Sequence, residues 1–225
     1  ILVSEWCSHE DLKIYLSKNF ELFKKNPIYW NILFFQIIYT LTVIQMKYPN
    51  FRHNDLHLKN ILVQETNTHK SDNYLYHLKI KHKDYYFVIP DIGIQIRIWD
   101  YDWSSIDKLV TNKKAVQKNR HIPNRTFDLF CCMFLLEKVY KGIMVDNLRD
   151  EHLSFFADIK EGISEGDLET EKKHLLRTNQ EFAIPESILL RHSNIKCKNG
   201  IFKMFRYSAQ KVKHMNYNDQ YSYSE

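Results

Sequence analysis

The chain has 225 residues, with 32 Lys and Arg against 27 Asp and Glu, so its formal net charge is +5. Its composition, with 44% hydrophobic and 26% charged residues, is that of an ordinary globular protein, which excludes collagen, a disulfide mini-protein and a disordered tail. The basic charge is diffuse, so nucleic acid is not expected as the main partner. The sequence has 5 glycines and neither G-x-G-x-x-G nor G-x-x-x-x-G-K, so it lacks the usual phosphate loops.

The cysteine pattern indicates in which kind of cellular compartment the protein resides. The four cysteines form no C-x-x-C pair: Cys7, Cys131, Cys132 and Cys197. A zinc knuckle or a disulfide framework is therefore not expected, and a reducing compartment fits best. The first residues, ILVSEW, lack the basic region that opens a signal peptide. We expect an intracellular protein, cytoplasmic by default.

The first elements in chain order are a strand end over 1–6 and a short amphipathic helix over 10–19. Residues 27–46 carry no charge and are long enough to cross a bilayer. Five polar side chains along this stretch would be costly in lipid: Asn31, Gln36, Thr40, Thr42 and Gln45. We therefore predict a buried core helix over 27–47, and no association with a membrane.

A polar loop, FRHNDLHLKN, follows this helix and leads into an apolar strand at 61–63. A hairpin is predicted from 74–81 and 85–89, with its turn at 82–84. Residues 92–99 alternate between apolar and polar types, which is typical of a half-buried strand.

The second half of the chain begins with an irregular basic stretch over 103–124. A strongly apolar pattern then predicts a helix over 125–140. Weaker helical patterns follow near 147–160, 168–178 and 185–191. The end, 211–225, is polar and rich in Tyr, Asn and Ser, so we predict a flexible tail.

The densest functional signal is the loop from His53 to Val63, which carries a carboxylate, then an amide, then a strand. The Asp55 carboxylate can accept a proton from a hydroxyl group. The Asn60 carboxamide oxygen can ligate Mg²⁺, which prefers oxygen ligands. A second carboxylate, Asp100, follows the strand in IRIWDYD. If the two strands pair, Asp55, Asn60 and Asp100 converge on one metal-phosphate site.

These motifs resemble the protein kinase superfamily. HNDLHLKN stands where kinases carry H-R-D-L-x-x-x-N, and DYD stands where they carry D-F-G. SEWCSHEDLKIYL looks like a kinase hinge with its following helix, and Asp128 in FDLF matches the aspartate that supports the catalytic loop. The D-L-H variant is similar to haspin-like and small-molecule kinases. YYFVIPDIG before IWDYDW is similar to kinase-like proteins of large DNA viruses.

The resemblance implies an α+β protein-kinase-like fold. We expect the mainly helical C-terminal (large) lobe over 1–210, with a small β-ribbon beside the catalytic loop. Within it, 4–11 would be the hinge, 53–63 the catalytic loop and 98–104 the metal-binding segment. Because the sequence opens at the hinge, the N-terminal lobe would be absent from this chain.

The resemblance also implies ATP and Mg²⁺ as cofactors, with roles for particular residues. Asp55 would be the catalytic base, and Asn60 and Asp100 would hold Mg²⁺. Many kinases use a Lys near the γ-phosphate where this chain has His57, and Lys59 would compensate for it.

At the nucleotide base, the same resemblance implies that Glu5 opens the hinge and that Trp6 and Cys7 offer backbone groups to adenine. Asp11 falls where many kinases keep an acidic residue for the ribose. Leu62 would form the floor of the adenine pocket.

The implied function is ATP- and Mg²⁺-dependent phosphoryl transfer to Ser/Thr hydroxyls of a protein substrate. A pseudokinase or scaffold is the first alternative, favoured by the missing small lobe and by Asp102 where kinases keep Gly. A small-molecule kinase is the second, suggested by D-L-H. A metallohydrolase would explain HNDLH but neither Asn60 nor IWDYD. Asn54 stands where kinases usually carry Arg, so we do not expect pairing with a phosphorylated activation loop.

Overall fold

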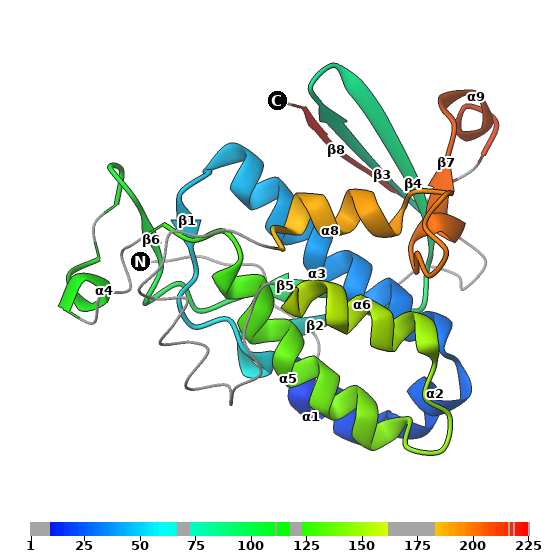
Figure 1. Ribbon diagram of the computed structural model, residues 1–225, viewed down its shortest axis with the longest axis horizontal. Coiled ribbons are helices and arrows are strands. Elements are labelled where there is room, and N and C mark those ends of the chain that lie inside the picture. Colours follow the sequence, from blue (N-terminus) through cyan, green and yellow to red (C-terminus); the bar gives the residue numbers. More distant parts are fainter. Residues whose placement is uncertain are drawn as a thin grey trace.

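The computed structural model describes residues 10–66, 73–110, 112–117, 123–161, 183–215, 217 and 219–224. It is an α+β structure (Figure 1). The longer helices are α1 (Leu12–Lys18), α2 (Phe20–Lys25), α3 (Ile28–Lys47), α5 (Phe127–Ile143), α6 (Asp150–Lys160) and α8 (Pro185–His192). Shorter helical turns are η1 (Leu58–Asn60), α4 (Lys113–Gln117), η2 (Lys203–Phe205) and α9 (Ala209–Val212).

The strands of the described residues form three sheets. Two are pairs: β1 (Phe51–Arg52) with β6 (Ser105–Ile106), and β2 (Ile61–Glu65) with β5 (Ile94–Ile98). The third has the order β7-β4-β3-β8 and consists of β3 (Asn73–Ile80), β4 (Lys83–Pro90), β7 (Arg206–Tyr207) and β8 (Asp219–Ser224). The small β-ribbon that we expected beside the loop corresponds to β2 and β5, and the four-stranded sheet is an addition to it.

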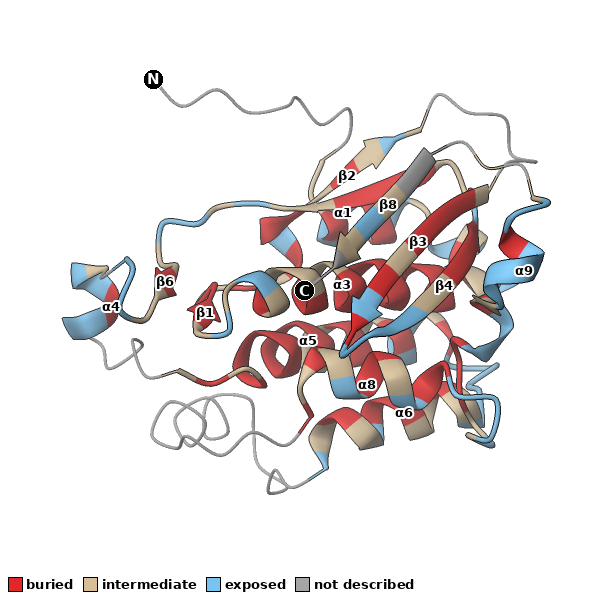
Figure 2. Ribbon diagram, turned by 90° about the horizontal axis from the view of Figure 1, so that it is seen from above, coloured by how far each residue is buried: buried red, intermediate tan, exposed pale blue. Residues whose placement is uncertain are grey.

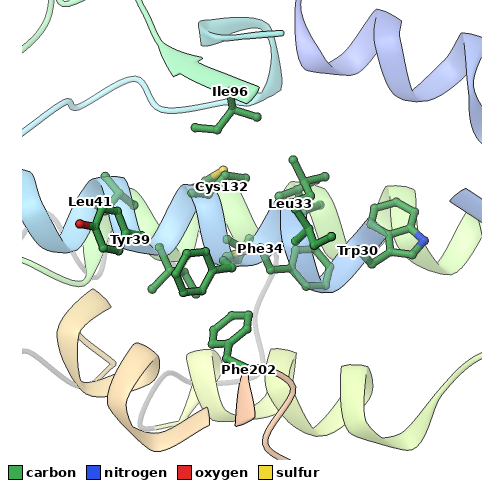
Figure 3. Close-up of a cluster of buried hydrophobic side chains, with 14 of the residues drawn as sticks. Trp30, Leu33, Phe34, Tyr39, Leu41, Ile96, Cys132 and Phe202 are labelled. Atoms are coloured by element: carbon green, nitrogen blue, oxygen red, sulfur yellow. The ribbon is translucent and has the colours of Figure 1, made fainter. Parts of the chain in front are cut away.

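Helix α3 is the centre of the hydrophobic core (Figures 2 and 3). The Phe34 ring stacks on Phe155 of α6 at 5.1 Å between ring centroids, and Trp30 meets Tyr140 of α5 edge-on at 5.2 Å. By length and a mean hydropathy of 1.4, α3 could cross a membrane, but 72% of its most apolar window is buried inside the protein. The prediction of a core helix is confirmed.

The polar residues of α3 are hydrogen-bonded, which explains how they can lie in a core. Gln36 accepts a hydrogen bond from the Ile96 backbone N–H through Oε1 at 2.9 Å, and Gln45 donates to the Arg125 carbonyl at 2.9 Å. Thr40 donates to the Gln36 carbonyl within the helix. Buried polar groups must be hydrogen-bonded, so these side chains join α3 to β5 and to the segment that enters α5.

The hairpin of β3 and β4 differs slightly from its prediction. Ile80 pairs with Lys83, so the turn consists of Lys81 and His82, with φ angles of 46° and 63°. Positive φ at both central residues defines the two-residue turn whose twist suits a hairpin. The turn therefore lies one residue earlier than expected, and Asp84 belongs to β4.

The prediction of a flexible tail over 211–225 is wrong for its last part. Residues 219–224 form β8, which runs parallel to β3 with Tyr221 opposite Tyr76. The Tyr221 ring stacks on Tyr76 at 5.0 Å, and Tyr221 and Tyr223 pack against the core. Tyr-Ser-Tyr alternates with a period of two residues, which is typical of a strand. This alternation was a better guide to the segment than the polar composition from which we predict a flexible tail. The strand expected over 1–6 and the helix expected over 168–178 lie outside the described residues.

A buried histidine couples three helices and predicts a pH dependence. His152 of α6 hydrogen-bonds Tyr140 Oη of α5 through Nδ1 and Asn31 Oδ1 of α3 through Nε2. Burial lowers the pKa of His152 to about 4. The unfolded chain binds this proton near pH 6.5, so the stabilisation is complete above pH 6.5 and is lost as the pH falls towards 4. We expect a contribution of about 3 kcal/mol over that window.

The measurement is urea unfolding at pH 7 and pH 4.5 of the wild type, His152→Gln and His214→Gln. His214 is exposed and serves as the matched control. His152→Gln should flatten the pH dependence of the unfolding free energy, while His214→Gln should leave it unchanged. Equal pH dependence in all three proteins would contradict the assignment.

Candidate active site

The pairing of β2 with β5 sets the position of two predicted ligands. Ile61 pairs with Ile98, and the Trp99 backbone N–H donates to the Asn60 carbonyl at 2.9 Å. Asn60 directly precedes β2, and Asp100 follows β5 by two residues. The two residues therefore lie at the same end of one strand pair. From the sequence, a shared site is expected if these two strands pair, and the strands do pair.

The Asn60 amide is oriented by Asp55. Its Nδ2 donates to the Asp55 carbonyl at 2.9 Å and lies 3.4 Å from the Asp55 carboxylate Oδ2. This use of the amide nitrogen leaves the carboxamide oxygen of Asn60 for a cation. Asp55 is half-buried, so its carboxylate is accessible and its backbone is fixed.

Asp128, a buried residue in the first turn of α5, holds the backbone of the loop that carries Asp55. Asp128 Oδ2 accepts from the His53 backbone N–H at 2.7 Å, and Oδ1 accepts from the Asn54 N–H at 3.0 Å. Hydrogen bonds to an ionised acceptor are stronger than neutral ones. The expected support of the loop by Asp128 is confirmed.

His53 connects the loop to the residue before Asp100. Its buried ring forms a hydrogen bond from Nε2 to the Trp99 carbonyl at 2.8 Å. The residue thus links the loop to the end of β5, which is a structural role, and we assign it no chemistry.

Asn54 has a role that the sequence did not reveal. It is buried, with a φ of 67°, and its Nδ2 donates to the Trp103 carbonyl at 2.9 Å and to Ser105 Oγ at 3.1 Å. From the sequence, Asn54 stands out only as a departure from the Arg of kinases. The tolerance of Asn for the left-handed conformation was the available signal. Neutral hydrogen bonds therefore tie the loop to the segment after Asp100.

Asp100 itself adopts the left-handed conformation, with a φ of 59°. Its Oδ1 accepts from the Asp102 backbone N–H at 3.3 Å. Asp102 is not among the described residues with positive φ, so the turn does not require the glycine that kinases keep there. Asp tolerates this conformation better than most residues.

The remaining described residues of the predicted site lie within the loop 53–63 or, in the case of Asp11, beside it at the start of α1. Asp11 and Leu62 form a β-bridge, and Asp11 caps α1 by accepting from the Ile14 N–H at 3.0 Å. Lys59 is exposed in η1. His57 Nε2 lies 3.7 Å from Asp55 Oδ2. The predicted adenine contacts at positions 5 and 7, Glu5 and Cys7, lie outside the described residues.

The oxygens of Asn60 and Asp100 fit Mg²⁺. This ion is usually held by one or two protein oxygen ligands together with substrate phosphates and water. Within the part of the chain that the structure describes, no group of three or more His, Cys, Asp and Glu side chains could hold a metal by itself. Asn60 and Asp100 would therefore supply two oxygen ligands of the type that Mg²⁺ prefers.

A loop held by a helix aspartate, an amide fixed to its carboxylate and an aspartate after the paired strand are the features implied by the kinase resemblance. Comparison with known proteins agrees with this class. The family of poxvirus serine/threonine protein kinases matches residues 2–189, and the chain belongs to this family.

Two related proteins come from Acanthamoeba polyphaga mimivirus, where they are named as candidate serine/threonine-protein kinases. One, R400, is 44% identical over 116 residues, which cover 51% of this chain and 24% of the relative. The other, R301, is 30% identical over 127 residues, which cover 53% of this chain and 31% of the relative. The matched region of the chain thus covers less than a third of the length of either relative.

Proposed function

We propose that this protein transfers the γ-phosphoryl group of ATP to Ser/Thr hydroxyls of a protein substrate in the presence of Mg²⁺. The observation that carries the proposal is one hydrogen-bonded unit: Asp128 holds the backbone of the loop, Asn60 bonds to Asp55, and the β2–β5 pair brings Asp100 to the same end. The family and the names of the mimivirus relatives support it. In this proposal the described helices around α3 are the large lobe of a kinase.

Phosphoryl transfer needs mainly positioning and charge neutralisation. The Asp55 carboxylate accepts the proton of the acceptor hydroxyl and orients its oxygen towards the phosphorus atom. Asn60 Oδ1 and the Asp100 carboxylate would hold Mg²⁺, which neutralises charge on the phosphate oxygens when bound. Lys59 adds a positive charge beside the loop.

The nucleotide base would lie along β2. Asp11 and Leu62 are adjacent there, so a ribose and an adenine could contact them together. We propose that Glu5 and Cys7 complete this part of the site.

Asp55→Asn tests the catalytic base. General-base catalysis contributes about 100- to 10,000-fold, so we expect a loss of at least ~100-fold in kcat with nucleotide affinity retained. The measurement is transfer of radiolabelled phosphate from ATP to a Ser/Thr peptide library. Asp146→Asn, a surface change at a side chain that is 75% exposed, is the control and should keep full activity. Equal rates for Asp55→Asn and the wild type would refute the role.

A scaffold function without turnover is the alternative that the sequence suggests through Asp102, although the turn after Asp100 does not require a glycine at that position. The same assay separates the two, because a scaffold shows no transfer in the wild type and no difference between the variants. A small-molecule kinase would phosphorylate small alcohols in a substrate panel and leave the peptides unmodified. The viral family supports an intracellular protein of the host cell.

A further inference from the structure

The segment 191–213 is the most one-sidedly charged part of the chain, with seven Lys and Arg and no Asp or Glu. Some of this charge is neutralised by other elements. Arg191, for example, contacts Asp158 at 3.0 Å and Glu161 at 2.9 Å. Arg206 of β7 is different, because its surroundings contain another cation and a cavity.

A cavity of about 510 Å³ is lined by residues from the end of α8, the start of β4 and β7; Figure 1 locates these three elements. Its described lining contains two cations and no acid: Lys83, Tyr85, Leu190, Ser193, Asn194, Ile195, Arg206, Tyr207 and Ser208. Side chains alternate along a strand, so Lys83 and Tyr85 share a face of β4. The side chain of the intervening Asp84 bonds His77 Nε2 at 2.8 Å instead.

The Arg206 guanidinium is fixed in place by aromatic rings. It lies 4.2 Å from the Tyr85 ring centroid and 5.3 Å from that of Phe87, and Nη2 donates to the Asp84 carbonyl at 3.5 Å. Nη1 is buried and has no hydrogen-bond partner within the described residues. A buried donor without an acceptor is costly, and burial lowers the pKa of Arg206. An anion in the cavity would correct both.

Other donors line the same cavity. Asn194 Oδ1 accepts from the Lys196 N–H at 3.0 Å, which leaves its amide nitrogen to donate. Ser208 Oγ accepts from the Lys211 N–H at 3.4 Å, which leaves its hydroxyl hydrogen. A guanidinium, an ammonium, an amide and a hydroxyl together suit the several oxygens of a phosphate group. At the rim, Ile195 is 88% exposed and offers an apolar contact.

We propose that this cavity binds a phosphorylated Ser or Thr of a partner protein, with Arg206 and Lys83 on the phosphate and Ile195 against a neighbouring apolar side chain. The donors of the cavity surround a single concave site and suit one phosphate group, whereas a nucleic-acid surface presents a stripe of cations along the backbone. The site does not depend on phosphoryl transfer by the candidate active site, so each stands without the other.

The test is fluorescence polarisation with a labelled peptide that carries one phosphoserine followed by Ile, and with the same peptide unphosphorylated. We expect the phosphopeptide to bind at least ~10-fold more tightly. Lys83→Gln and Arg206→Gln should each weaken its binding about 10-fold. Lys213→Gln makes the same charge change at an exposed position outside the cavity and should change binding less than about twofold.

Because Lys83 is exposed, Lys83→Gln should keep the thermal midpoint of the wild type, which separates loss of binding from loss of folding. Competition identifies the source of the phosphate: inorganic phosphate should displace the peptide only at much higher concentration. Any one of four results would overturn the proposal. These are no phosphopeptide binding up to about 1 mM, equal binding of both peptides, equal loss in Lys213→Gln, or stronger binding of a single-stranded oligonucleotide than of the phosphopeptide.

Discussion

Replacing Asp100 with Asn is expected to weaken Mg²⁺-dependent ATP binding by about 100-fold, or ~2.7 kcal/mol. The substitution keeps the size of the side chain, and Asn tolerates the left-handed backbone that Asp100 adopts. It removes the negative charge that Asp100 would offer, together with the Asn60 oxygen, to a divalent cation. The measurement is titration calorimetry of ATP into the chain with Mg²⁺ and with EDTA.

Asp102→Asn is the matched control, because it changes the same charge two residues away on an exposed side chain. It should bind ATP as the wild type does. Equal weakening by both substitutions would mean that only the general charge of the turn matters. Unchanged binding in Asp100→Asn would remove Asp100 from the metal site.

Replacing Asp128 with Ala is expected to lower the free energy of unfolding by about 3–5 kcal/mol. The carboxylate holds two backbone N–H groups, those of His53 and Asn54, and both would lose their acceptor in a buried place. The measurement is urea unfolding, with hydrogen exchange of these two amides as a local probe.

Asp150→Ala is the matched control, because Asp150 also lies in the first turn of a helix but is exposed. Removing it costs only its interaction with the helix dipole, which is about 0.3–1 kcal/mol. A similar cost for the two substitutions would mean that Asp128 acts only as a helix N-terminal acid and does not support the loop.

The longest elements were predictable because their signal is local. The charge-free run of α3 and the apolar pattern of α5 predict helices with little ambiguity. The five polar residues of α3 argued against a membrane-spanning helix. In the structure, Gln36 hydrogen-bonds to β5 and Gln45 to the Arg125 carbonyl.

The sheet around the hairpin could not be predicted, since it depends on partners far apart in the chain. Strand β8 lies beside β3, with Tyr221 opposite Tyr76, and β7 lies on the other side of β4. Short polar strands such as Tyr-Ser-Tyr carry almost no signal until their partner strand is known.

In the candidate site, too, some residues could be predicted from the sequence and others could not. Motif order was enough to select Asp55, Asn60 and Asp100, because each stands in a fixed relation to an apolar strand. The role of Asn54 was not accessible, since it depends on hydrogen bonds to Trp103 and Ser105, some 50 residues later in the chain.

The central claim is that Asn60 and Asp100 hold the divalent cation of a bound nucleotide. Its most direct test is the anomalous scattering of Mn²⁺ in crystals of this chain grown with a non-hydrolysable ATP analogue. We predict a Mn²⁺ peak within ~2–2.3 Å of Asn60 Oδ1 and of an Asp100 carboxylate oxygen, with phosphate oxygens completing the shell. An ordered nucleotide with its metal away from both residues, or no Mn²⁺ at the end of the β2–β5 pair, would contradict the claim.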